Sequence, residues 1–384
     1  MAGAVTVVWD EALTAYDLGP QHPLRPERAQ LTVELARALG LLDKVTVIPP
    51  APVGGTDLAR VHDLDYLAAV QAASADGRPL PERGLGAGDT PSFVGMHEAS
   101  SLVCGASVAA AEAIRSGAAL HAFSPAGGLH HAMPGRASGF CIYDDPAVAI
   151  AWLLQLGVAR IAYVDVDVHH GDGVEALFAA DPRVLTISIH ESGRFLFPGT
   201  GFAHEIGEGE AKGTIANLPL PPNTTDELYL PAFDALVPAL VRAFEPEILV
   251  TQLGADSHYT DPLAHLALTT RCYQGLAGRL HDLAHTVTGG RWLATGGGGY
   301  QWATVVPRAW NTYLAEMVGS ELPPELPGAY RELVAERHGV DLDPATADDV
   351  VALRTDSRVK VEAQIGHTID TVRSSLFPLH GLDQ

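Results

Sequence analysis

The chain has 384 residues, of which 47% are hydrophobic, so it can hold one large α/β domain or two smaller ones around a sizeable core. Its 24 Lys and Arg residues stand against 46 Asp and Glu residues, and the net charge of −22 disfavours direct binding to nucleic acid or to an anionic membrane and favours cationic partners. No apolar run reaches the ~18 residues that span a bilayer, and no basic segment precedes an apolar one at the start, so we expect a cytoplasmic protein with no membrane partner.

In chain order, the first 120 residues predict strands at 5–9 and 45–48 and helices over 26–40, 63–73 and 93–116. A Gly- and Pro-rich loop over 78–91 separates the last two helices and carries Asp89 near its end. The three cysteines, Cys104, Cys141 and Cys272, are far apart and form no C-x-x-C pattern. We therefore expect small buried side chains rather than a disulfide framework or a structural zinc site.

The middle of the chain predicts a strand at 119–123, a helix over 146–157 and a buried strand within 162–173. A short helix over 174–180, a strand at 184–190 and a polar, hairpin-like stretch up to Pro222 follow. The remainder alternates regularly, with helices over 226–244, 269–287 and 301–317 and strands at 248–253 and 292–295.

This alternation of strand, loop and helix predicts an α/β fold, a single domain with a mostly parallel sheet and helices on both faces. We expect a catalytic domain over 1–320 and a helical extension over 321–384 that packs on the same domain. Ligands of such sheets bind at the carboxyl ends of the strands, which is where we expect the active site.

The segment AYVDVDVHHGDG (162–173) is the most informative part of the sequence. Because side chains alternate along a strand, Asp165, Asp167 and His169 should project to one side at its carboxyl end. Carboxylates among valines are costly to bury unless a counter-charge is present. A divalent metal ion is the obvious counter-charge.

Other polar clusters also follow predicted strands: His130 and His131 follow the strand at 119–123, Asp256 follows the one at 248–253, and Tyr300 ends a GGGGY segment after the one at 292–295. The topology of the sheet would bring these loops together. Asp167, His169 and Asp256 are our candidate ligands for a metal that activates water and polarises a carbonyl.

The tandem histidines can supply a general base and a charged partner, with Asp165 and Asp172 available to orient them. Tyr300 can donate a hydrogen bond to a developing oxyanion. Taken alone, GGGGY is equally typical of a phosphate-binding turn, although the chain lacks the Lys and Ser or Thr of a P-loop.

With these motifs the sequence resembles the arginase/deacetylase superfamily, specifically the zinc-dependent histone deacetylases of class I type and the bacterial acetoin-utilisation deacetylases. The resemblance runs from residue 22 to residue 300 and rests on HPLRPER, GLGAGDTP, GGLHHA, SGFC, VDVDVHHGDGV, FPGTG, NLPLP, GADSHYTDPL and GGGGY, in the family's order. It implies the arginase/deacetylase fold.

The resemblance also implies roles for individual residues. The metal ligands match Asp167, His169 and Asp256, the general base matches His131, and the transition-state tyrosine matches Tyr300. Asp165 and Asp172 match the carboxylates that hydrogen-bond His130 and His131. The substrate-binding positions match Asp89, Gly139, Phe140, Phe197 and Leu263, of which Asp89 lies at the rim, the two aromatics wall an acyl-lysine tunnel and Leu263 lies on its lip.

Two further features are implied only by the resemblance: an arginine at the inner end of an acetate-release channel, matched by Arg28, and a structural K⁺ ion. The family binds that ion through backbone carbonyls around Asp165, Asp167, His169, Ser188 and Ile189. On residue type alone, Phe140 and Phe197 remain compatible with ordinary core aromatics, and Asp89 with a plain turn residue.

The function implied is hydrolysis of Nε-acetyl-lysine in proteins by a zinc enzyme, with Fe²⁺ and Co²⁺ as alternative metals and acetate as a product. The alternative substrate is an acetylpolyamine or another small acetylated amine. Arginase-like guanidine hydrolysis, which needs ligands for two metals, fits less well. A catalytically silent binding protein is a hypothesis of another class.

Overall fold

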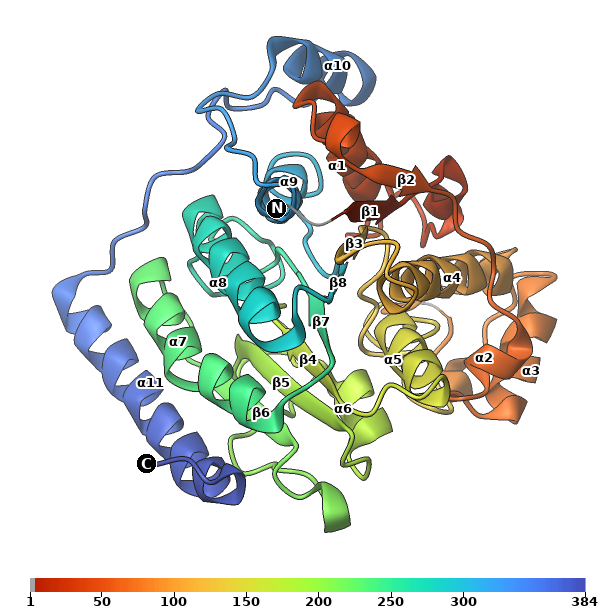
Figure 1. Cartoon of the computed structure of the whole chain (residues 1–384). Coiled ribbons are helices and arrows are strands. Elements are labelled where there is room, and N and C mark those ends of the chain that lie inside the picture. Colours follow the sequence, from red (N-terminus) through yellow and green to blue (C-terminus); the bar gives the residue numbers. More distant parts are fainter. Residues whose placement is uncertain (1–3, 87, 384) are drawn as a thin grey trace.

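The computed structural model describes residues 4–86 and 88–383, and its centre is one sheet of eight strands that all run parallel. The order across the sheet is β2-β1-β3-β8-β7-β4-β5-β6 (Figure 1). The strands are β1 (Val5–Val8), β2 (Thr46–Ile48), β3 (His121–Ser124), β4 (Ile161–Asp165), β5 (Val184–Glu191), β6 (Ile215–Leu220), β7 (Ile248–Gln252) and β8 (Trp292–Thr295).

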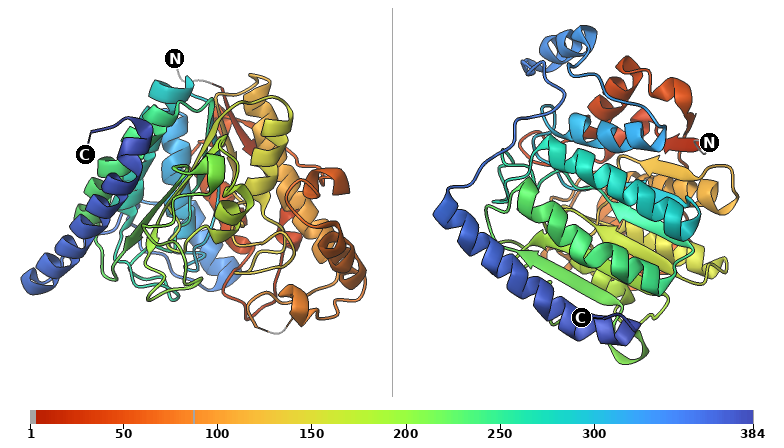
Figure 2. Two further views of the ribbon diagram at one scale, coloured as in Figure 1. Left: turned by 90° about the horizontal axis from the view of Figure 1, so that it is seen from below. Right: turned by 60° about the vertical axis from the view of Figure 1, so that its left-hand side comes forward.

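Helices cover both faces of the sheet, as Figure 2 shows. One layer runs α11-α7-α8-α9-α1, and the other is formed mainly by α3, α4, α5 and α6. The helices are α1 (Glu27–Ala38), α2 (Gly55–Leu58), α3 (Leu64–Ser74), α4 (Met96–Arg115), α5 (Asp145–Gln155), α6 (Asp172–Phe178), α7 (Asp226–Phe244), α8 (Thr270–Thr288), α9 (Val306–Met317), α10 (Gly328–His338) and α11 (Thr355–Leu376). None of the described helices has the length and apolar composition that crossing a membrane would require.

The α/β fold with a parallel sheet is confirmed, and the reason lies in the strand sequences. Every residue of β1, β3, β4, β5, β7 and β8 is buried, because helices cover both faces. Strands of this kind read as continuous apolar runs rather than as an alternation of polar and apolar residues. The bounds of α7 and β8 agree with those expected from the sequence.

The prediction of a hairpin-like stretch before Pro222 is wrong. Residues Ile215–Leu220 instead form β6, a parallel strand at the edge of the sheet that pairs with β5. Two residues that are unusual in a buried strand misled the prediction. Asn217 is buried and donates to Glu175, and Pro219 lacks an N–H group, which an edge strand tolerates. The α9 helix also begins at Val306, later than residue 301.

The segment after α9 packs on the sheet domain at two places. Helix α10 contacts α1, and α11 lies along β6 and α7 (Figure 2). Val372 and Leu376 of α11 are buried within the same hydrophobic core as the sheet. This packing covers the edge strand β6, which would otherwise expose unpaired backbone groups.

Four neighbouring strands in the middle of the sheet, β3, β8, β7 and β4, end in register. Their last residues pair in sequence across the sheet: Ser124 with Thr295, Thr295 with Gln252, and Gln252 with Asp165. The loops that leave these strands therefore start from one row, and they are the loops in which the sequence places its polar clusters.

Candidate active site

The carboxylates of Asp167 and Asp256 and the imidazole of His169 meet at the end of β4 and β7, and all three side chains are buried. Their candidate ligand atoms lie within 4.8 Å of one another. The His169 Nδ1 atom lies 3.1 Å from Asp167 Oδ1 and 3.1 Å from Asp256 Oδ2. Two carboxylates that share one imidazole in a buried site form a donor set suited to a divalent cation.

The backbone holds both carboxylates in place. Asp167 Oδ2 accepts hydrogen bonds from the Gly298 backbone N–H and from Gln252 Nε2, both at 2.7 Å, and Asp256 Oδ1 accepts one from the Val168 N–H at 3.0 Å. A Cβ atom on Gly298 would lie 1.9 Å from Asp256 Oδ2. The loop after β8 therefore requires glycine here, because its backbone approaches the carboxylates closely.

The tandem histidines form a hydrogen-bonded chain beside this cluster. His130 Nδ1 lies 2.7 Å from Asp165 Oδ2, the two Nε2 atoms of His130 and His131 lie 3.1 Å apart, and His131 Nδ1 lies 2.6 Å from Asp172 Oδ1. All four side chains are buried. Each imidazole is thus oriented by its own carboxylate, which is the arrangement expected of a base and its partner.

Electrostatics separate the two histidines. Burial alone would lower the pKa of His130, but the carboxylates of Asp165 and Asp167 outweigh it and raise that pKa to about 10. The pKa of His131 is lowered, by burial and by the positive charge of His130, against the opposing effect of Asp172. At neutral pH this favours a cationic His130 next to a neutral His131, which can accept a proton.

Tyr300 lines the same pocket as these groups. A narrow pocket is lined by residues that include His130, His131, Gly139, Asp167 and Tyr300. Burial, followed by the charges of Asp256 and Asp167, raises the pKa of Tyr300 well above its ordinary value, so its hydroxyl remains a proton donor for hydrogen bonds. Its backbone N–H donates to Asp261 Oδ2 at 3.0 Å, which anchors the GGGGY segment.

Two aromatic side chains pack against residues that line this pocket. The centroid of the Phe140 ring lies 5.7 Å from that of Tyr300, and the centroid of the Phe197 ring lies 5.0 Å from that of His131. Phe197 is 44% exposed, so it is not an ordinary core aromatic. Leu263 is partly buried, and its N–H donates to Asp261 Oδ1.

Asp89 binds a loop of the protein itself. Its Oδ2 accepts a hydrogen bond from the Gly139 N–H at 2.7 Å, and the backbone carbonyl of Asp89 lies 3.2 Å from His22 Nε2. Gly139 has φ +52°, and a Cβ atom there would lie 2.3 Å from His131 Cδ2. Asp89 therefore helps to hold the loop that passes directly against the candidate base.

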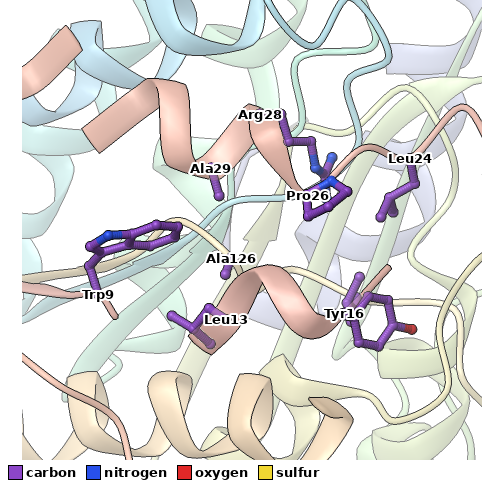
Figure 3. A pocket seen from close by; sticks show the side chains of 9 residues that line it. Trp9, Leu13, Tyr16, Leu24, Pro26, Arg28, Ala29 and Ala126 are labelled. Carbon is purple, nitrogen blue, oxygen red and sulfur yellow. The ribbon is translucent and has the colours of Figure 1, made fainter. Parts of the chain in front are cut away.

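Arg28 lies at the inner side of the site, 3% exposed, and its guanidinium donates to the Gly297 carbonyl. Figure 3 shows it beside Pro26 and Leu24 in a small internal cavity that also has Trp9 and Tyr16 in its lining. Leu24 and Leu129 line both this cavity and the Tyr300 pocket, so the two hollows are neighbours.

Three residues of the site were missed in the sequence. Gln252, fully buried, bridges Asp167 and the Gly128 carbonyl, and Asp145 accepts from the N–H groups of Gly128 and Leu129. Asp261 holds the backbone of Tyr300. Asp145 is a carboxylate at the start of an apolar run, a signal like that of Asp165, whereas Gln252 carries no charge and gave no such signal.

Comparison with known proteins agrees with this geometry. The histone deacetylase domain family matches residues 22–317. An "Acetoin utilization protein AcuC" of Bacillus subtilis (strain 168) is 44% identical over 325 residues, which cover 83% of this chain and 84% of that protein. Proteins of the same name from Staphylococcus xylosus and Staphylococcus aureus (strain MRSA252) are 37% and 38% identical, with coverage of 82% and 81% of this chain and 83% and 81% of theirs. The resemblance seen in the sequence is thereby confirmed, and the chain belongs to the histone deacetylase family and is a deacetylase.

Proposed function

We propose that the chain removes the acetyl group from Nε-acetyl-lysine side chains of proteins, releases acetate, and uses Zn²⁺ held by Asp167, His169 and Asp256. The observation that carries the proposal is the placement of a neutral imidazole, His131, and a phenol, Tyr300, in one narrow pocket with Asp167. Acyl-group hydrolysis needs a base and an oxyanion donor arranged around one carbonyl carbon. Fe²⁺ and Co²⁺ suit the same donor set.

A divalent ion bound by these ligands would polarise the acetyl carbonyl and make a water molecule more acidic. His131 has its Nδ1 engaged by Asp172, so its Nε2, which accepts from the cationic His130, would give up that bond to take the proton of the attacking water. The same proton can then pass from His131 to the amine nitrogen as the C–N bond breaks. Water supplies the new C–O bond, and the products are acetate and a free amine.

The charge of His130 and the hydroxyl of Tyr300 act on the negative charge that develops during the attack. Tyr300 can donate a hydrogen bond to the carbonyl oxygen as that oxygen becomes an oxyanion. His130, whose Nδ1 lies 2.7 Å from Asp165, lies 3.1 Å from His131, and its positive charge holds down the pKa of that base. The two histidines together thus provide a base that is neutral, and able to accept a proton, at neutral pH.

Substrate binding in this proposal uses Asp89, Gly139, Phe140, Phe197 and Leu263. The exposed ring of Phe197 and the ring of Phe140 can enclose the four methylene groups of an acyl-lysine. Arg28 faces the inner cavity, where its guanidinium could attract the acetate product.

We also infer that residues 1–320 form the catalytic domain and that residues 321–384 are an extension packed on it. Backbone carbonyls around Asp165 and Ser188 hold K⁺ in this proposal, and the protein acts in the cytoplasm.

The second candidate function is deacetylation of an acetylpolyamine or another small acetylated amine. The net charge of −22 supports it, because such substrates keep positive charges after acetylation, whereas Nε-acetyl-lysine is neutral. The pocket itself suits either, since both present a linear acetamide.

The test compares kcat/KM of the metal-loaded protein on acetyl-lysine peptides of varied sequence and on acetylated spermidine and putrescine. We expect the peptides to be the better substrates, with acetate and peptide amine formed in equal amounts. Good turnover of the polyamines with none of the peptides would contradict the proposal in favour of the second candidate. No turnover of any acetylated substrate by fully loaded protein would support a silent binding protein. Metal analysis after anaerobic purification, with activity restored by each metal in turn, tests Zn²⁺.

A further inference from the structure

A second cluster of side chains that could bind a metal lies at the amino ends of the strands, opposite the carboxyl ends that carry the active site. It is formed by His121, the first residue of β3, and by His281 and His285 of α8. His121 pairs across the sheet with Trp292, the first residue of β8. The active-site loops leave the carboxyl ends of these same two strands, so the two sites are separated by the length of the strands.

The geometry of the three imidazoles suits a shared ion. Their candidate ligand nitrogens lie within 4.8 Å of one another, and the Nε2 atoms of His281 and His285 are 3.0 Å apart. Nitrogen ligands at 2.0–2.1 Å from a tetrahedral Zn²⁺ lie roughly 3.3 Å from each other. Small side-chain adjustments would therefore complete three of the four positions.

His121 supplies an independent indication of a ligand. Its side chain is 0% exposed, and within the described part of the chain neither of its ring nitrogens has a hydrogen-bond partner. Its ring faces those of His281 and His285 at centroid distances of 5.0 and 5.1 Å. A buried imidazole without partners is costly, and coordination of a metal ion would satisfy it.

The surroundings favour a cation as well. Glu316 of α9 lies with its Oε1 atom 3.2 Å from His281 Nδ1, which leaves His281 Nε2 directed at the cluster. A carboxylate behind a ligating histidine is the arrangement that fixes the tautomer and orientation of metal ligands. His285 lies in the last turn of α8, where the helix dipole favours positive charge, and it is exposed, so an ion can enter from solvent.

We propose that His121, His281 and His285 form a second site for a divalent transition-metal ion, Zn²⁺ foremost, that links β3 to α8 and is independent of the catalytic site. Three imidazoles suit Zn²⁺, Ni²⁺ and Cu²⁺ better than Mg²⁺ or Ca²⁺. The fourth position faces solvent and would hold water. An ion here joins two elements far apart in the sequence, so it stabilises the fold rather than taking part in hydrolysis.

The test counts zinc in the full-length protein by elemental analysis after chelation and re-equilibration with buffered Zn²⁺. We expect two ions per chain in the natural protein, one in His281→Gln/His285→Gln, one in Asp167→Ala, and none when these changes are combined. The exposed pair His204→Gln/His367→Gln is the matched control and should keep two ions. Glu316→Gln should lower the affinity of the second site for Zn²⁺ by about 10- to 100-fold.

A second measurement follows thermal stability. Added Zn²⁺ should raise the Tm of Asp167→Ala and of the control pair, and should have no such effect when His281 and His285 are changed as well. The single change His285→Gln, at an exposed position, serves if the double variant folds poorly. An unchanged zinc count in His281→Gln/His285→Gln, or only one ion in the natural protein, would overturn the proposal. Deacetylation should be unaffected by His285→Gln.

Discussion

The hydroxyl of Tyr300 can be tested separately from binding. It should bond more strongly to an oxyanion than to a neutral carbonyl, so its loss should act mainly on the transition state. We expect Tyr300→Phe to keep its fold and metal content, to lower kcat by about 10²–10³ and to change KM much less. Steady-state kinetics with metal analysis checks this, and Asp167→Ala is the contrasting variant that should lose the ion of the active site and the activity together. Near-full turnover of Tyr300→Phe would contradict the oxyanion role of Tyr300 and leave the GGGGY segment with a structural role only.

Gln252 is the residue through which the proposed metal ligands can be disturbed without removing one. Its Nε2 donates to Asp167 at 2.7 Å, and its Oε1 accepts from the Gly254 N–H at 2.7 Å. Gln252→Met keeps the volume but loses both bonds, so we expect the affinity for the catalytic metal to fall about 10- to 100-fold. Competition with a coloured chelator measures it.

A matched control for this change is Gln301→Met. The Gln301 amide also donates a hydrogen bond, but to the exposed Thr260 carbonyl and not to a proposed metal ligand. It should leave the metal affinity unchanged. Equal affinity in Gln252→Met and the natural protein would show that Gly298 and the backbone alone orient Asp167.

How far the site could be predicted depends on charge. Asp167 and His169 stand out because ionisable groups among valines have few structural explanations, and Asp256 because it follows a strand that the topology brings alongside. The structure does bring these three together. Gln252 has no charge, so it gave no such signal although it touches the same carboxylate. The bond from Asp89 to Gly139 depends on two loops 50 positions apart, which spacing cannot reveal.

At the scale of elements, His62 fastens the start of α3 to the loop that carries the tandem histidines. Its Nδ1 lies 3.1 Å from the Met133 carbonyl, and its Nε2 accepts from the Asp144 N–H at 3.0 Å. Burial lowers the pKa of His62 to about 4, from an ordinary value of 6.5, because a protonated ring would be desolvated and would lose the Asp144 bond.

This lowered pKa makes stability depend on pH. Between pH 6.5 and about 4 the unfolded chain binds more protons than the folded one, so the contribution of His62 is fully present above pH 6.5 and declines as the pH falls through this window. We expect this group to reduce the free energy of unfolding by about 2 kcal/mol between about pH 7.5 and pH 5. Urea unfolding at both values measures it. His62→Gln should show a correspondingly smaller loss, and an identical loss would assign the pH dependence to other groups.

The bounds of helices and strands were predicted best where the sequence of the element itself determines its structure. The bounds of α7 follow from an amphipathic run between Thr225 and Glu245, and β8 from four buried residues before a glycine-rich loop. β6 was misread because its place at the sheet edge is decided by packing against α11, which lies about 150 residues later. Its polar residues then indicate an edge position and not a hairpin.

At the scale of the whole molecule, the net charge of −22 creates a field that should attract cationic substrates. Burial lowers the pKa of His22, whose ring lies beside Phe140, and the negative charges of the exposed Asp89 and Asp17 oppose that shift. Negative charge is therefore present at the entrance as well as over the surface. A peptide in which lysines flank the acetyl-lysine should be drawn to it.

Salt should expose this attraction. Raising the ionic strength from about 0.05 M to 0.5 M shortens the screening length from roughly 14 Å to roughly 4 Å. We expect kcat/KM for a lysine-flanked acetyl-lysine peptide to fall about 3- to 10-fold over this range, and that for a neutral peptide of the same length to change by less than about twofold. Asp17→Asn should keep most of the salt dependence, because the field arises from many charges. If both peptides responded equally to salt, the acidic surface would have no part in substrate choice, and its role would reduce to keeping the protein apart from its own copies.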